Sequence, residues 1–271
     1  MTAAGHPLPA SGTPASGADP TERFGARAAA YARARPGYPD FVVAALAQAL
    51  QLSRSAQVVD VGCGTGLSAE PFLRAGYRVI GVEPNASMRA LALERLAGAA
   101  GFRAVAGRAE ATGLPSACAD LMIAAQAFHW FDVPATRAEA LRVLRPPAHA
   151  ALFWNDRLSE GSPFCAGYEQ LVRTFSAEYA ELRHRHERAD RIDAFFGHRR
   201  WRTITVTHGD ELDYARLADR LNSASYMPPP EDARHAPMML ALQELFASTA
   251  RHGVVTMEFE TRVLYGELAP D

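Results

Sequence analysis

The 271-residue chain contains no lysine, because all 28 of its basic residues are arginine. This excludes lysine chemistry, including a Schiff base with a carbonyl substrate or pyridoxal phosphate and the lysine of a P-loop. The three cysteines, Cys63, Cys118 and Cys165, are far apart and form no CxxC pair. Such spacing argues against a zinc site or a disulfide framework, so we expect no metal and a reducing, cytoplasmic location.

The sequence also lacks a strong charge of one sign and a long apolar run. Its formal net charge is −2, so no overall basic field indicates a nucleic acid or an anionic membrane as a partner. No stretch is long and apolar enough to span a bilayer. Residues 1–20 are rich in Pro, Gly, Ala and Ser without the basic start and apolar run of a signal peptide, and we expect a disordered tail there.

Residues 55–156 alternate between short β-branched runs and amphipathic stretches. The expected strands cover 57–62, 77–83, 102–107, 119–126 and 148–156, and helical patterns over 67–76, 85–97 and 133–146 lie between them. Alternation of this kind is typical of βαβ units and predicts a doubly wound α/β fold with a parallel sheet.

The segments on either side of this core have a different character. Residues 21–54 read as two helical stretches broken by "RPGYP", and we expect an N-terminal helical region. Residues 157–271 supply two more β-rich runs, 200–212 and 254–265, among amphipathic helices. The prediction is a mostly parallel, seven-stranded sheet with a helical cover in the C-terminal half.

The segment "VVDVGCGTG" is a strand that runs into Gly62, Gly64 and Gly66. Glycine lets the backbone turn sharply and approach a ligand closely, and the amides of the following helix face the same place. The spacing is not GxGxxG, and a P-loop motif is absent. This loop can seat an uncharged stretch of ligand, with Asp60 near a positive end.

Glu83 ends the second strand, within "GVEPN". A carboxylate at this strand tip can accept hydrogen bonds from both hydroxyls of a ribose, as the acidic residue does in dinucleotide folds. The alternative is a surface glutamate that caps the following helix. The glycine loop and Glu83 together indicate a nucleoside ligand.

Several segments resemble, in order, the consecutive motifs of class I S-adenosylmethionine-dependent methyltransferases. They are "VVDVGCGTG", "VIGVEPNASM", "GRAEATGLP", "ADLMIAAQAFHWFD" and "RAEALRVLRP". The small-molecule branch that includes trans-aconitate methyltransferase-like proteins is most similar, and "YARARPGYP" and "HWFD" resemble that branch too. The resemblance covers residues 31–146 and implies a Rossmann-like methyltransferase fold, S-adenosylmethionine as cofactor and S-adenosylhomocysteine as its product.

The resemblance implies roles for the residues of the first two motifs. Gly62, Gly64 and Gly66 would lie against the methionine and ribose part of the cofactor. Asp60 would hold the loop and, directly or through water, the amino group. Glu83 would accept from the ribose hydroxyls.

The later motifs would contact the adenine and the reacting centre. Pro84 and Met88 would flank the adenine, Ala109 and Glu110 would approach its edge, and Gln126 would line the pocket near the sulfonium. One departure affects this part, because many family members carry Asp where this chain has Arg108. Arginine has no acceptor for the adenine amino group, so recognition would rest on Glu110, a backbone carbonyl or water.

His129 follows the fourth strand, where the pocket of an open α/β sheet lies. Its unperturbed pKa of ~6.5 suits a general base near neutral pH. Methyl transfer needs a base only if the acceptor must lose a proton, so the alternative is that "HWF" is wall, with Trp130 against the substrate. Both interpretations stay open.

Further candidates lie outside the motifs. Tyr31, Arg35 and Tyr38 belong to a segment that covers the cofactor as a lid in the similar family, and ordinary helix packing is the alternative. Trp154 follows the fifth strand, and Tyr226 precedes "PPP". We expect Tyr31 and Arg35 to contact the cofactor, and Tyr38, Trp154 and Tyr226 to contact the substrate.

The sequence thus predicts a methyltransferase that acts on a small, apolar or aromatic molecule through an O, N or C acceptor, in specialised metabolism. We expect a monomer or homodimer without a nucleic-acid or membrane partner. One alternative is O-methylation of a small carboxylic acid paired with Arg35 or Arg157. Another is a protein of the same fold that binds the cofactor but does other chemistry, such as cyclisation.

Overall fold

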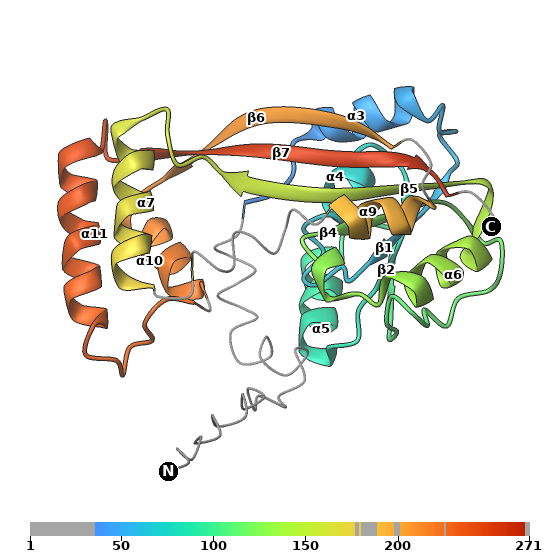
Figure 1. Cartoon of the computed structure of the whole chain (residues 1–271), viewed down its shortest axis with the longest axis horizontal. Helices are drawn as coiled ribbons and strands as arrows, with labels where there is room; N and C mark the ends of the chain where they lie inside the picture. The colour runs from blue at the N-terminus through green and yellow to red at the C-terminus, as the bar shows by residue number, and fades with distance from the viewer. Residues whose placement is uncertain (1–35, 177–178, 180–188, 198–200, 225, 269–271) are drawn as a thin grey trace, which may run out of the picture.

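The computed structural model describes residues 36–176, 179, 189–197, 201–224 and 226–268. Tyr31 and Arg35 therefore lie outside the described residues. One sheet runs through the described chain in the order β3-β2-β1-β4-β5-β7-β6 (Figure 1). Its strands are β1 (Gln57–Val61), β2 (Arg78–Val82), β3 (Phe102–Val105), β4 (Ala119–Ala125), β5 (Leu144–Arg157), β6 (Arg202–Leu212) and β7 (Val255–Glu267).

Strands β1 to β5 are parallel to one another, and β7 runs antiparallel between β5 and β6. The predicted doubly wound, seven-stranded α/β fold is confirmed. Because chain order reverses between β1 and β4, the crevice at their carboxyl ends is the topological switch point, where ligands bind in open α/β sheets.

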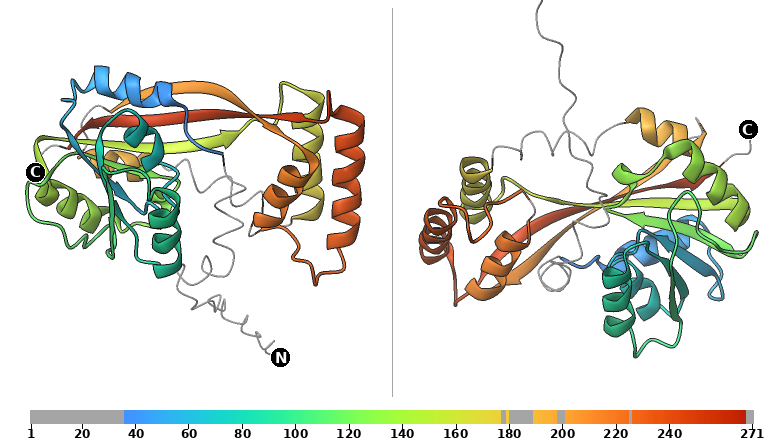
Figure 2. Two further views of the ribbon diagram at one scale, coloured as in Figure 1. Left: turned by 180° about the vertical axis from the view of Figure 1, so that it is seen from behind. Right: turned by 90° about the horizontal axis from the view of Figure 1, so that it is seen from below.

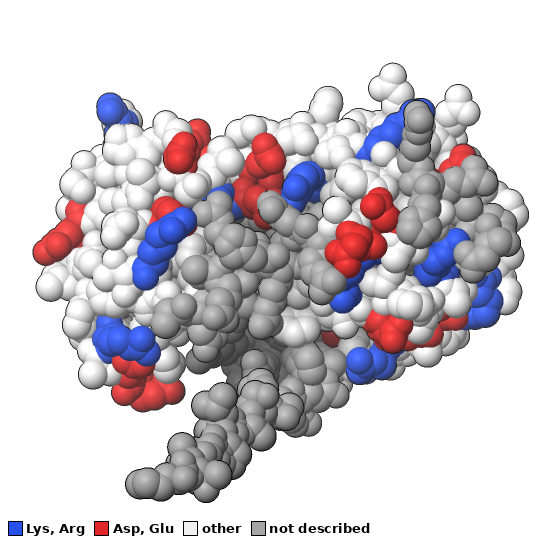
Figure 3. All heavy atoms as spheres, viewed as in Figure 1, with Lys and Arg blue, Asp and Glu red and all other residues white. Residues whose placement is uncertain are grey.

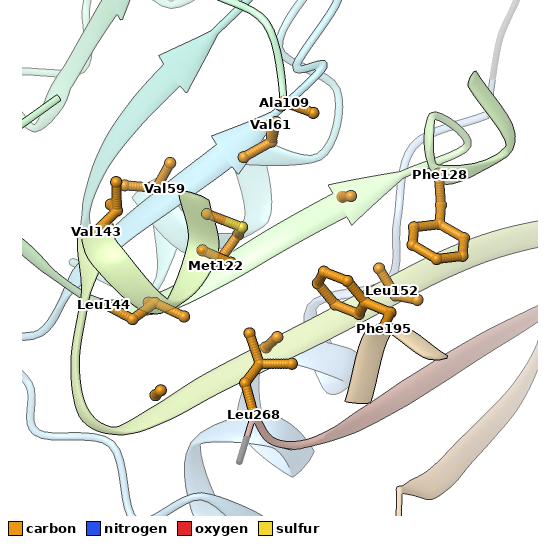
Figure 4. Packing of buried hydrophobic residues seen from close by; sticks show 14 of the residues in the cluster. Val59, Val61, Ala109, Met122, Phe128, Val143, Leu144, Leu152, Phe195 and Leu268 are labelled. Atoms are coloured by element: carbon orange, nitrogen blue, oxygen red, sulfur yellow. The ribbon is translucent and has the colours of Figure 1, made fainter. Parts of the chain in front are cut away.

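Helices cover both faces of the parallel part. They are α3 (Asp40–Ala49), α4 (Ala69–Arg74), α5 (Ala86–Arg95), the 3-10 turn η1 (Phe128–Trp130), α6 (Val133–Val143) and α9 (Ala189–Phe196). Side chains alternate along each strand, so Val59 and Met122 pack with α6 and α9, whereas Val58 and Leu121 pack with α3 and α4 (Figure 4). Burial on both faces explains why β1 and β2 read as nearly continuous apolar runs.

A second group of helices stands apart from this core. The helices α7 (Pro163–Phe175), α10 (Tyr214–Ser223) and α11 (His235–Thr249) pack at the far ends of β5, β6 and β7 (Figures 1 and 2). These strands span 14, 11 and 13 residues, against 5 for β1, so they extend well past the parallel core. Of the helices in the described ranges, none has the length and apolar character to cross a membrane.

Candidate functional site

A cavity of about 680 Å³ lies where the carboxyl ends of the core strands meet the second group of helices. Its two walls differ. We call the wall formed by the tips of β1, β2 and β4 with η1 the glycine-loop half. The helical half is the wall formed by the outer parts of β5 and β7 with α7 and α10. A volume of this size is typical of sites for small molecules and cofactors.

The glycine loop joins β1 to α4 with Gly62, Gly64 and Gly66 at φ +68°, +53° and +82°. A Cβ on Gly62 would lie 2.8 Å from the Cβ of Ala127, and one on Gly66 would lie 2.7 Å from Leu96. Both glycines are therefore required by conformation and by space. A Cβ on Gly64 would meet only Met88 at 3.6 Å, and Gly64 lines the cavity.

Glu83 connects this loop to the next one. One carboxylate oxygen accepts from the Gly64 amide and the other from the Asn85 amide, both at 2.9 Å. Burial raises the pKa of Glu83, opposed by these two hydrogen bonds and by Arg89. The helix that follows is capped by Asn85, whose Oδ1 accepts from the Met88 amide, so Glu83 is not the cap. Glu83 also lines the cavity, where each oxygen retains a lone pair for a ligand hydroxyl.

Asp60 is fully buried behind the loop and does not line the cavity. Its Oδ2 accepts from Ser68 Oγ at 2.6 Å, and its Oδ1 has no hydrogen-bond partner among the described residues. Burial raises the pKa of Asp60 to about 7, Ser68 opposes the shift and Glu83 adds to it. Thr65 is a cavity residue that the sequence analysis does not single out. Its Oγ1 is buried and makes no hydrogen bond within the described part of the chain.

These features fit S-adenosylmethionine. The loop glycines leave a cradle that side chains would fill, and Thr65 offers an unused hydroxyl on the wall. The carboxylic acids Asp60 and Glu83 lie beside the loop, and a cofactor with sulfonium and ammonium groups would favour their ionised forms.

The segment after β3 supplies the side wall. Arg108, Ala109 and Glu110 all line the cavity, and backbone hydrogen bonds join Arg108 and Ala111 in a tight turn. The guanidinium of Arg108 lies 3.6 Å from the Glu110 carboxylate, whose other oxygen accepts from the Asp132 amide at 2.9 Å. Arg108 thus pairs with the neighbouring acid Glu110. Pro84 and Met88 line the same cavity.

Gln126 directly follows β4 and has φ +53°, a left-handed conformation that is uncommon for a residue with a side chain. Its amide donates to the Phe153 carbonyl, and its Nε2 donates to the Asn155 carbonyl, both at 3.0 Å. Strained residues of this kind concentrate at functional sites. Gln126 lines the cavity at the switch point.

The turn η1 brings His129, Trp130 and Phe131 to the cavity mouth. The rings of His129 and Trp130 are 4.8 Å apart, and Trp130 is half exposed. Beneath them the buried Phe128 packs edge-on against Phe195 at 5.3 Å (Figure 4). The packed rings of Phe128 and Phe195 therefore set the position of the turn.

The expected substrate residues separate into two groups. Tyr38 and Tyr226 line the cavity, where Tyr38 packs on Phe153 and Tyr226 on Tyr179. Trp154 does not, and that expectation is wrong. Its side chain is 2% exposed and packs edge-on against Phe128 inside the core, in the cluster that includes residues of α6 and α9.

The helical half adds cavity residues that carry no sequence motif. From the sequence alone, Arg157 is named only in the alternative of a carboxylic acid substrate. The other cavity residues of this half are not named. They are Tyr168, Tyr179, Arg220, Met257, Phe259, Glu260 and Arg262. They come from four separate elements or segments, and only the fold brings them together.

Residues 59–152 match the family model described as "Methyltransferase domain". An uncharacterized methyltransferase of Mycobacterium tuberculosis (strain ATCC 25618 / H37Rv) is 33% identical over 138 residues, which are 49% of this chain and 52% of that protein. The ubiquinone biosynthesis O-methyltransferase of Nitrobacter winogradskyi is 49% identical over 41 residues, 15% of this chain and 16% of that protein. This chain thus spans about half the length, or less, of the curated relatives named.

Among solved structures, a protein provisionally assigned as a type II methyltransferase from Anaeromyxobacter dehalogenans has a TM-score of 0.65 at 22% identity. The match covers 88% of this chain and 99% of that one. A protein provisionally assigned as a methyltransferase from an antibiotic biosynthesis pathway of Anabaena variabilis ATCC 29413 has a TM-score of 0.53 at 18% identity. That match covers 85% of this chain and 98% of the other. These likenesses show the fold. Residues 59–152 thus match a methyltransferase domain, and the described chain shares the fold of these solved structures.

Proposed function

We propose that this protein transfers the methyl group of S-adenosylmethionine to a small organic molecule. The observation that carries the proposal is the glycine loop, which Glu83 holds at the switch point beside a cavity large enough for a cofactor and a substrate. When bound, the cofactor supplies the electrophilic methyl group. The protein's task is to orient the acceptor and exclude water.

Each part of the glycine-loop half has a role in this proposal. The loop and Thr65 hold the methionine part, and Glu83 accepts from the ribose hydroxyls. Ala109 and Glu110 face the adenine. Gln126 lines the space near the reacting centre, held there by its bond to the Asn155 carbonyl.

The acceptor molecule is proposed to be small, with an apolar or aromatic body. Tyrosine, phenylalanine and methionine side chains of the helical half support this, because they offer flat apolar surface. On the described surface in Figure 3, arginine and acidic side chains are interspersed without a large patch of one sign, which favours a small molecule over a nucleic acid. We propose a cytoplasmic enzyme of specialised metabolism, monomeric or homodimeric, with an O, N or C acceptor.

Calorimetry with S-adenosylmethionine tests the cofactor site. Wild type should bind, and Glu83→Ala should weaken binding by about 100-fold, because hydrogen bonds to a charged group contribute ~1.5–3 kcal/mol each. Glu94→Ala, an exposed acid on the neighbouring helix, is the matched control. Absence of binding to wild type would reject the proposal.

Mass spectrometry tests the reaction. Candidate acceptors incubated with enzyme and cofactor should gain one methyl group while S-adenosylhomocysteine accumulates. Cofactor consumption with a product that has gained no methyl group would instead favour the alternative of other chemistry on the same fold.

A further inference from the structure

Arg157 occupies an unusual position at the outer end of β5. Its Nη2 donates to Glu169 at 2.6 Å and to the Tyr179 hydroxyl at 3.0 Å, and its guanidinium lies 4.8 Å from the centre of the Tyr168 ring. Arg173 also donates to Glu169, at 2.8 Å. Two guanidinium groups therefore share one carboxylate, and one edge of Arg157 is fully engaged.

The other edge of Arg157 is not engaged. Its Nη1 is buried and has no hydrogen-bond partner among the described residues. A buried charged donor without an acceptor is costly, and native proteins rarely retain one without a reason. Since Arg157 lines the cavity, a ligand oxygen can be the missing acceptor.

Arg220, on helix α10, also shares a carboxylate with a second arginine and also lies over an aromatic ring. Its Nη2 donates to Asp210 at 2.6 Å, and Asp210 also pairs with Arg216. Its Nη1 lies 3.7 Å from the sulfur of Met257, a weak acceptor, and its guanidinium lies 5.6 Å from the centre of the Phe259 ring. Burial lowers the pKa of Arg220, and the hydrogen bond to Asp210 opposes this shift.

The two arginines face the same region. Phe259 is the register partner of Arg157 across β5 and β7, so side chains of this pair share one face of the sheet. Arg157 shares Glu169 with Arg173, and Arg220 shares Asp210 with Arg216. Glu260 and the Asp156–Arg262 pair also line the cavity, but alternation places them on the opposite face of the sheet.

The position along the strand matters as well. Phe153 pairs with Ala125 at the tip of β4, and Arg157 lies four residues further along β5. At ~3.3 Å per residue this is about 13 Å along the strand. The side chain of Arg157 packs on α7, away from the switch point.

We infer that the substrate carries an oxyanion, a carboxylate or a phosphate, which Arg157 and Arg220 bind as a handle while a different atom of the same molecule accepts the methyl group. Nη1 of Arg157 can donate a charge-assisted hydrogen bond to an oxyanion, and the rings of Tyr168 and Phe259 accommodate an aromatic or apolar body. The inference rests on the proposed function, since it assigns the substrate class of that cavity.

Benzoate, phenyl phosphate and benzamide are suitable probes, because they share one ring and differ in charge. Their affinities are measured by ligand-observed NMR on the full chain saturated with S-adenosylhomocysteine. Wild type should bind one of the anions at least about tenfold more tightly than benzamide. Equal affinities, or binding of no probe, would overturn the inference, and the two anions distinguish a carboxylate handle from a phosphate handle.

Variants assign the preference to its residues. Arg157→Gln and Arg220→Gln should each abolish the preference for the anion, whereas Arg173→Gln should retain it. Arg173 pairs with the same Glu169 but does not line the cavity, so it controls for a purely structural effect. Preference retained in both Arg157→Gln and Arg220→Gln would overturn the inference.

Two further readouts separate the possible failures. Cofactor affinity should be unchanged in Arg157→Gln, and thermal melting confirms that each variant is folded. If wild type fails to bind the cofactor, the proposed function fails; if it binds cofactor but shows no preference for anions, only this inference fails. A methylated product that reverts in mild alkali would be an ester of the carboxylate itself and would overturn the assignment as a handle.

Discussion

The two halves of the cavity are built from different parts of the chain. The glycine-loop half uses main chain in left-handed conformations at Gly62, Gly64, Gly66 and Gln126, held by short hydrogen bonds. The helical half uses long side chains such as Arg157 that reach from extended strands and helices. A cavity wall made of main chain restricts which residue types can occupy its positions. A wall made of side chains requires only that the tips of the side chains reach the cavity.

The largest expected difference in the free energy of unfolding is between alanine substitutions at two glycines with equally close neighbours. A Cβ on Gly62 or on Gly209 would lie 2.8 Å from a side-chain atom, but only Gly62 has a positive φ. Gly62→Ala should lower the free energy of unfolding by ~2–5 kcal/mol, the sum of left-handed strain and overpacking.

Gly209→Ala in β6 should cost ~1 kcal/mol, because the methyl group of Thr256 can move. Urea unfolding of both variants measures the difference. Equal losses would show that the left-handed conformation of Gly62 adds nothing to the cost of the close contact.

The second prediction concerns pH and Asp60. Its pKa is about 7 in the folded chain against an ordinary 3.8, so the folded state holds the proton more tightly. The associated stability is present at low pH and is lost as pH rises through 7, because the buried carboxyl then ionises. Asp60→Asn should therefore flatten the decline in unfolding free energy between pH 5 and pH 8, an effect of up to a few kcal/mol.

The exposed Asp40 provides the control, since Asp40→Asn makes the same change of side chain at a carboxylate that is not buried. Denaturant unfolding at several pH values measures all three proteins. An unchanged profile for Asp60→Asn would show that the buried carboxyl does not titrate in this range.

The smallest expected effect is at His129, which the turn η1 places at the cavity mouth above the packed rings of Phe128 and Phe195. His129→Gln should keep turnover within about tenfold of wild type, because general acid–base catalysis typically contributes ~10²–10⁴-fold and a wall residue contributes less. His129→Ala should weaken substrate binding more than it slows turnover. Steady-state kinetics measures both variants. If turnover falls by ~10²–10⁴-fold while cofactor affinity is unchanged, His129 acts as a general base.

The sequence predicts the glycine-loop half well, for a physical reason. Gly62 and Gly66 cannot be replaced where φ is positive and a neighbour is within 3 Å, so the motif is visible in the letters. Trp154 shows the limit, because its place in the core depends on which face of β5 meets α9. Arg220 shows it more strongly, since helix α10 reaches the cavity only through the packing of distant segments.

Strand β4 ends at Ala125, whereas β5 continues to Arg157. Beyond Phe153, no strand of the described chain pairs with the inner edge of β5, and this edge borders the cavity. The Asn155 carbonyl there already accepts from Gln126. A substitution changes a side chain but leaves the peptide N–H and C=O groups in place. The backbone donors and acceptors of this edge therefore stay the same when the side chains around the cavity change. Related chains with other substrates would keep this pattern.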